Sequence, residues 1–170
     1  MEFYIAQGLS ILTCIVAVAK MQFKDMKMIL AGQILSNLLS ASTYLLLGGL
    51  SGGGVCIIAI FQTVTMFVYN AKKVPPHKSV IALFILLYMG YSVLYYKSFI
   101  DIFSAIAAIT FAMSVVQTKP ALSRLWYLFN PLCWLIYDIY TKAYGNFVLH
   151  IIVFSSTLFA IIRNDIKRKA

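Results

Sequence analysis

The side chains best suited to holding a small molecule follow one another along a single apolar segment, residues 122–141. In a helix of 3.6 residues per turn, their spacing places them on one face. They are Asn130, Trp134, Tyr137, Asp138 and Thr141. Indole and phenol rings can stack on a ring-bearing molecule, and an amide both donates and accepts hydrogen bonds. This stripe predicts one wall of a solute site; the alternative is a packing face with polar contacts to neighbouring helices.

Three residues in or near this stripe suggest motion or proton transfer. Pro131 removes one helical hydrogen bond and frees the carbonyl of Tyr127, which makes it a candidate hinge. His150 is a candidate for proton coupling because histidine changes charge near neutral pH, and the alternative is a neutral histidine bonded to a neighbouring helix. Asp138 is a second candidate for proton coupling, unless it forms a local ion pair with Lys142 four residues later.

A second polar face lies in the apolar segment 28–48. Its members share helical spacing and are uncharged: Gln33, Ser36, Asn37, Ser40 and Tyr44. Gln62, in the next segment, carries a further amide. We expect Gln33, Asn37, Tyr44 and Gln62 to line the same cavity as the first stripe, while helix packing through small polar residues is the alternative.

The composition shows which elements must position these side chains. Of 170 residues, 62% are hydrophobic and 11% are charged, whereas soluble domains have roughly 45–50% apolar and about 25% charged residues. A soluble domain and a disordered chain are both excluded. Apolar segments approach the length of about 20 residues that a membrane-spanning helix needs. The seven segments are 3–20, 28–48, 52–70, 79–96, 98–117, 122–141 and 145–163, and the glycines at 52–54 predict a turn.

Basic residues alternate between the connections of these segments. The net charge is +9, and 12 of the 14 basic residues fall in the first, third and fifth connections and in the C-terminal tail. Lys97 and Lys142 fall on the other side. Because cytoplasmic loops carry an excess of Lys and Arg, this pattern predicts seven spans, an outside N-terminus and a cytoplasmic C-terminus. The basic residues, Lys20 and Arg124 included, are therefore interpreted as topology signals, and no nucleic acid is expected as a partner.

An internal repeat relates the two polar faces. Displacing the sequence by 93 positions superimposes Asn37 on Asn130 and Tyr44 on Tyr137. The prediction is an all-α membrane protein whose seven helices form two parallel three-helix repeats around a site at their interface. Its parts are a first repeat at 3–70, a linker helix at 79–96, a second repeat at 98–163 and a cytoplasmic tail at 164–170, all within one integral membrane domain over 1–170.

Two short runs and the order of the helices resemble known families. The run NPLCWLIY at 130–137, followed by AIIR at 160–163, resembles the YgjV-type bacterial inner-membrane proteins. The plan of three, one and three helices is similar to that of the SWEET sugar transporters of the PQ-loop (MtN3-like) group and of the PnuC vitamin transporters. SWEET-like transporters use asparagine and tryptophan pairs, so this likeness implies solute contacts for Asn130 and Trp134. The chain has no Pro-Gln pair, and Trp134-x-x-Tyr137 stands where PnuC proteins have Trp-x-x-Trp.

These observations predict a small-solute transporter or facilitator that works by alternating access in the bacterial inner (plasma) membrane. The site has no cluster of basic residues, so a neutral or ring-bearing solute is expected, such as a sugar, a nucleoside or a vitamin. The alternative is a non-transporting receptor, chaperone or lipid-interacting scaffold with the same fold. There is no HExxH motif or glutamate pair, so we expect no enzyme, no cofactor and no metal site. The expected partners are the lipid bilayer and the solute, and a homo-oligomer is compatible with the sequence.

Overall fold

The computed structural model describes residues 2–46, 50–96, 99, 101–141 and 144–166; the side chains of Tyr44, Tyr137 and Asp138 lie outside the described part. The described residues form seven α-helices and a π-helical turn, which confirms the predicted all-helical fold. The helices are α1 (Glu2–Gln22), α2 (Met26–Leu46), α3 (Leu50–Ala71), α4 (Lys78–Leu94), α5 (Asp101–Val116), α6 (Pro120–Thr141) and α7 (Tyr144–Ile161), and α7 continues into η1 (Ile162–Ile166).

The predicted glycine turn is wrong. Residues 52–54 lie inside α3, which begins at Leu50. A side chain at Gly54 would place its Cβ only 2.6 Å from the Tyr91 hydroxyl oxygen of α4. The absence of a side chain at Gly54 therefore leaves room for the end of the Tyr91 ring, so this glycine serves the packing of α4 on α3 rather than chain reversal.

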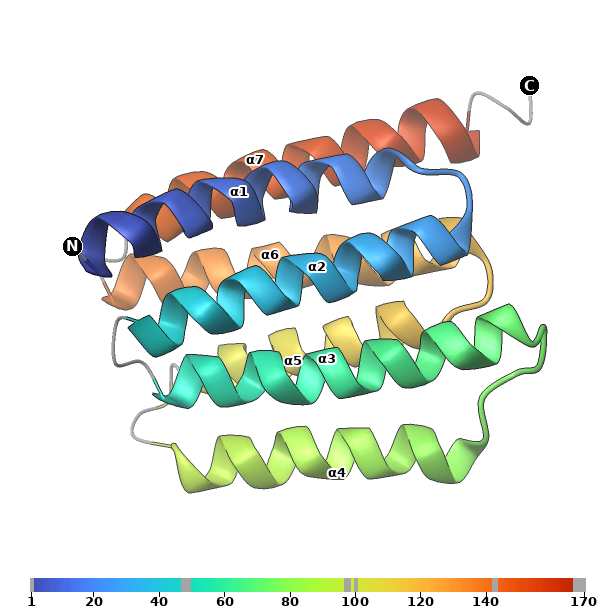
Figure 1. The fold of residues 1–170 in the computed structure, drawn as a ribbon, viewed down its shortest axis with the longest axis horizontal. Coiled ribbons are helices and arrows are strands. Elements are labelled where there is room, and N and C mark those ends of the chain that lie inside the picture. The colour runs from blue at the N-terminus through green and yellow to red at the C-terminus, as the bar shows by residue number, and fades with distance from the viewer. Residues whose placement is uncertain (1, 47–49, 97–98, 100, 142–143, 167–170) are drawn as a thin grey trace.

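The seven helices lie side by side and alternate in direction, and the two ends of the chain lie at opposite ends of the bundle (Figure 1). Helix α2 packs against α1 and α3, and α6 packs against α5 and α7. These two groups of three helices meet where α1 packs on α7 and α3 packs on α5. Helix α4 packs on α5 and α3 at one edge of the bundle (Figure 1).

Three stretches within the described residues are long and apolar enough to cross a membrane: Tyr4–Gln22, Gly53–Ala71 and Phe147–Ile166. Helices α4 and α5 are apolar but have only 17 and 16 residues. Helices α2 and α6 are long enough, but they carry the two polar faces. That α2, α4, α5 and α6 also cross the membrane stays a prediction. Their alignment with α1, α3 and α7 supports it (Figure 1).

The surface and the interior of the bundle differ in the size and polarity of their side chains. Large apolar side chains such as Ile15, Leu86 and Phe159 are exposed. The interior combines small residues such as Ala107 with many polar side chains and with larger apolar ones such as Phe111. A lipid solvent favours this distribution, because acyl chains solvate the apolar exterior and small residues allow helices to pack closely.

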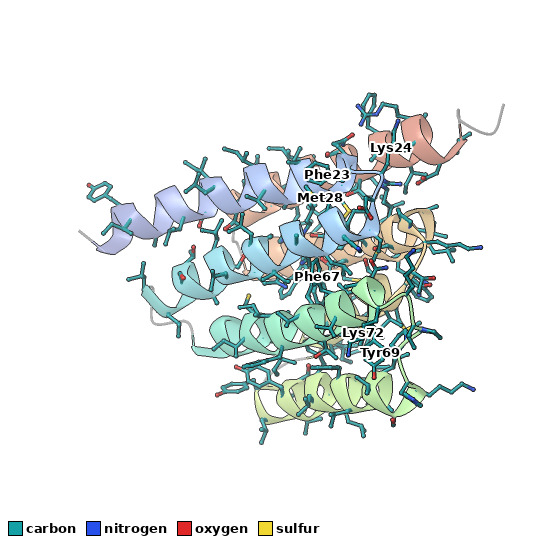
Figure 2. The ribbon with its side chains drawn as sticks, turned by 45° about the vertical axis from the view of Figure 1, so that its right-hand side comes forward. Phe23, Lys24, Met28, Phe67, Tyr69 and Lys72 are labelled. Carbon is teal, nitrogen blue, oxygen red and sulfur yellow. The ribbon has the colours of Figure 1, made fainter. Side chains whose placement is uncertain are left out.

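The connections that follow α1, α3 and α5 lie at the same end of the bundle as the C-terminus (Figure 1). Figure 2 shows Lys24, after α1, and Lys72, after α3, at this end. Because these connections and the C-terminal segment carry most of the basic residues, we call it the basic end.

Candidate functional site

The candidate residues on α2 form a buried pair. The Gln33 side-chain amide donates a hydrogen bond to the side-chain oxygen Oδ1 of Asn37 at 3.2 Å, one helical turn away. Both side chains are buried, as are those of Ser36 and Thr43 on the same helix. The polar face predicted for α2 therefore lies inside the bundle rather than against lipid.

Asn130, the counterpart of Asn37 in the predicted repeat, is also buried. Its amide nitrogen donates to the Ala107 carbonyl oxygen of α5 at 2.8 Å. Pro131, the next residue, is fully buried, and α6 continues through it as one helix. A hinge at Pro131 thus stays a prediction.

Gln62 connects the two groups of three helices where α3 packs on α5. This residue of α3 is fully buried, and its amide nitrogen donates to the Ala112 carbonyl oxygen of α5 at 3.4 Å. The amide oxygen of Gln62 and the amide nitrogen of Asn37 have no hydrogen-bond partner. Since buried polar atoms are nearly always paired, these two atoms are available to a water or to a polar solute.

Trp134 and His150 form a contact that the sequence analysis did not foresee. Their rings are stacked across α6 and α7, with centroids 6.0 Å apart and planes 8° apart. Both side chains are partly buried. The candidate solute-stacking residue and the candidate proton carrier are therefore neighbours. Tyr44, Tyr137 and Asp138, the other ring-bearing and acidic candidates, have side chains outside the described part.

The prediction that Arg124 lies in a connection, as a charge that sets the topology, is wrong. Arg124 lies within α6 and is only 1% exposed. Its Nε donates to the Met21 carbonyl oxygen at 2.8 Å, and a terminal nitrogen donates to the Phe23 carbonyl oxygen. The other terminal nitrogen forms an ion pair with Asp165 of η1 at 2.7 Å. Carbonyl groups at a helix C-terminus lack partners within the helix, so the end of α1 offers Arg124 the acceptors that make its burial tolerable.

Further hydrogen bonds attach the end of α1 to α7 and η1. The Gln22 amide donates to the Ser156 carbonyl oxygen at 3.0 Å and to the Ser156 hydroxyl oxygen at 2.9 Å. The Ser156 hydroxyl donates to the Val18 carbonyl oxygen at 3.3 Å, and the Asn164 amide donates to the Gln22 carbonyl oxygen at 3.4 Å. At the basic end, α1 is thus joined to α6, α7 and η1 by four residues, which we call the α1 clasp: Gln22, Arg124, Ser156 and Asn164.

Lys20 is the second basic residue that the sequence analysis assigned to a connection and the structure buries. It lies inside α1, is 1% exposed, and places its ammonium 4.6 Å from the centre of the Tyr127 ring on α6. On α2, a Cβ at Gly32 would lie 2.7 Å from the Lys20 Cβ. One sequence feature could have indicated this burial, since the apolar residues Met21 and Phe23 follow Lys20 before the chain turns.

Two hollows lie at the basic end. The larger measures about 420 Å³ and is lined by Asn70, Lys73, Val74, Pro75 and Thr118. The smaller measures about 210 Å³ and is lined by Lys24, Lys119, Pro120, Ala121, Arg124, Asn164 and Asp165. Neither is lined by Asn37, Asn130 or Trp134. Arg124 and Asn164 of the α1 clasp lie in the wall of the smaller hollow.

An antiparallel helical bundle with large apolar side chains on its exterior and many buried polar side chains in its interior defines a polytopic α-helical membrane protein. Within this class, the chain belongs to the Imp-YgjV family of bacterial inner membrane proteins, whose family model matches residues 4–168. The resemblance seen at residues 130–137 is thereby confirmed, and membership of the family places the chain in the bacterial inner membrane. No curated protein and no solved structure is detectably similar to the chain.

Proposed function

We propose that the protein is a small-solute transporter or facilitator that works by alternating access. The observation that carries this proposal is the way the two groups of three helices meet. If α1, α2 and α3 correspond to α5, α6 and α7, the contact of α1 with α7 corresponds to the contact of α5 with α3, and both contacts are present. Two parallel repeats about an axis along the membrane normal have this symmetry, and in transporters built so the solute binds between the repeats.

The solute site of this proposal lies between the polar faces of α2 and α6. Asn37 and Asn130 occupy equivalent positions in the repeat, and both are buried. Trp134 adds a ring for stacking, as in the SWEET-like plan. Gln33 and Gln62 add amides from the first group. Amides and aromatic rings suit a polar, ring-bearing solute such as a sugar, a nucleoside or a vitamin.

The proposed transport cycle begins from a conformation that is closed at the basic end. The α1 clasp holds the first group of helices to the second there, through Arg124, Gln22, Ser156 and Asn164. Opening toward this end requires these bonds to break, after which the two groups can rock about the central site. By the positive-inside rule the basic end faces the cytoplasm, and the N-terminus lies outside.

Ligand-dependent thermal stabilisation of the purified protein tests the proposal, with sugars, nucleosides and vitamins as the panel. A solute that binds the folded state raises its unfolding temperature in a concentration-dependent way. We expect a solute found in this way to lose its effect in Asn130→Ala and Trp134→Ala, and to be taken up by proteoliposomes of the wild type. Asn70→Ala is the matched control, because Asn70 lines a hollow at the basic end. Wild-type uptake by both site variants would refute the site.

A non-transporting receptor, chaperone or lipid-interacting scaffold is the second candidate. One feature favours it: Lys72, Lys73 and Lys78 are exposed at the basic end, and Lys73 lines the larger hollow. These charges can attract anionic lipid or an acidic partner. Neutralising these lysines should abolish function under this alternative and leave uptake intact under the transporter proposal. Neither proposal includes a catalytic step or a cofactor.

A further inference from the structure

The smaller hollow at the basic end collects positive charge. Its wall contains three basic side chains and one acidic side chain, which are Lys24, Lys119, Arg124 and Asp165. Arg124 and Asp165 form an ion pair with each other, and the second oxygen of Asp165 is buried and has no hydrogen-bond partner. Neither lysine forms an ion pair with a described residue. The charge that the wall leaves uncompensated is therefore that of Lys24 and Lys119.

The two lysines come from opposite sides of the contact between the groups of helices. Lys24 lies between α1 and α2, in the first group, and Lys119 lies between α5 and α6, in the second. Like charges around one small space repel each other, whereas an anion placed between them attracts both. A bound anion would thus turn a repulsion between the two groups into an attraction.

The size of the hollow suits a phosphate group. Its volume of about 210 Å³ is several times the roughly 30 Å³ that a water molecule occupies in the liquid. It is smaller than the pockets of about 300–1,000 Å³ that enclose drug-sized ligands. The hollow therefore accommodates a charged group of a few heavy atoms rather than a whole ring-bearing solute, and lysine is a common ligand of phosphate.

Exposed apolar side chains border the hollow, which favours a lipid over a soluble phosphate ester. Each is the sequence neighbour of a residue in the wall: Phe23 of Lys24, Leu122 of Ala121, and Ile166 of Asp165. Figure 2 shows Phe23 and Lys24 together at the basic end, which the positive-inside rule places at the cytoplasmic surface of the membrane. Acyl chains can contact these apolar side chains while the phosphate enters the hollow.

We infer that the smaller hollow binds the phosphate of an anionic phospholipid, held between Lys24 and Lys119 across the contact of the two groups of helices. The lipid supports the α1 clasp, because Arg124 and Asn164 of the clasp lie in the same wall. A zwitterionic phospholipid also carries a phosphate, but the cationic group of its own headgroup offsets the charge, so it binds more weakly. This inference goes beyond the proposed function and does not depend on the transport of a solute.

The test uses the full-length protein, purified free of lipid in a neutral detergent, with the unfolding temperature as the readout. Phosphatidylglycerol is compared with phosphatidylcholine of the same acyl chains at constant ionic strength. Glycerol 3-phosphate is the third probe, because it has the phosphate without the acyl chains. The variant combines Lys24→Gln with Lys119→Gln. The matched control combines Lys27→Gln with Lys72→Gln, which also removes two exposed lysines from the basic end but none from the hollow. All four side chains are exposed, so both double variants should fold.

In the wild type and in the control, we expect phosphatidylglycerol to raise the unfolding temperature saturably and by more than phosphatidylcholine does. In the variant without Lys24 and Lys119, its apparent dissociation constant should rise about tenfold or more, because two cationic contacts with the phosphate are lost.

Three results would overturn the inference. Equal effects of the two lipids on the wild type would show that the charge of the lipid is not recognised. A phosphatidylglycerol effect that is the same in both double variants would assign the attraction to the basic end as a whole. Stabilisation by glycerol 3-phosphate as strong as that by phosphatidylglycerol would assign the hollow to a soluble phosphate ester instead of a lipid.

Discussion

The guanidinium of Arg124 lies 2.7 Å from a carboxylate oxygen of Asp165, which ties the first turns of α6 to the π-helical turn after α7. The same guanidinium donates to the Met21 and Phe23 carbonyl oxygens at the end of α1. One side chain therefore joins three segments that are far apart in the sequence. The first group of helices is held to the second at the basic end through this residue.

Removing Arg124 should destabilise the protein strongly. Arg124→Gln leaves the Asp165 carboxylate and the Met21 and Phe23 carbonyls without their donor. Breaking a buried ion pair from one side costs about 3–5 kcal/mol. Because Asp165 is 17% exposed, we expect a cost at or below the lower end of this range. The measurement is the unfolding temperature in detergent. Asp165→Asn keeps an acceptor oxygen for Arg124 and should lower the unfolding temperature less. Equal stability of Arg124→Gln and the wild type would contradict this account of the α1 clasp.

The close packing of α1 and α2 at Gly32 gives a second prediction. A methyl group there would lie 2.7 Å from the Lys20 Cβ, so Gly32→Ala must push the helices apart. Overpacking of this kind costs about 1–3 kcal/mol. At Gly90 no atom lies within 4 Å of the added Cβ. Gly90→Ala should therefore leave the unfolding temperature unchanged or raise it, since alanine favours the helix by about 1 kcal/mol. A similar effect of both substitutions would refute the packing argument.

The orientation of the bundle can be tested with reporter fusions. The C-terminus lies at the basic end (Figure 1), which the positive-inside rule assigns to the cytoplasm. A green fluorescent protein fused to the C-terminus should be fluorescent, and alkaline phosphatase fused there should be inactive. Fusions between α2 and α3 should behave in the opposite way. Active phosphatase at the C-terminus would reverse the assigned topology.

The helices were predictable because lipid imposes a simple rule on the sequence. Backbone groups in a bilayer must pair within the segment, so each long apolar run becomes a helix, and the ends found here differ from the expected ones by a few residues. The prediction of a turn at residues 52–54 was wrong because a run of glycines does not distinguish a chain reversal from close helix packing. Only the position of Tyr91 on α4 shows that Gly54 serves packing.

The roles of Lys20 and Arg124 could not be read from local patterns. Both stand at segment ends, where basic residues usually remain in water, and their burial depends on partners distant in the sequence. Arg124 is buried because it binds carbonyls about a hundred positions earlier, and Lys20 is buried because Tyr127 and Gly32 enclose it. By contrast, helical spacing alone placed Asn37 and Asn130 in the interior, where both lie.

Accessibility of the central site from both faces of the membrane tests alternating access most directly, and it needs no knowledge of the solute. Asn37→Cys is placed in a background with Cys14, Cys56 and Cys133 changed to serine, and reconstituted protein is treated with a membrane-impermeant maleimide from either side. A transporter whose two groups of helices rock about this residue should be modified from both faces, and faster from the basic end when Arg124→Gln opens the α1 clasp. Modification from neither face, or from one face alone in both backgrounds, would contradict the proposed cycle.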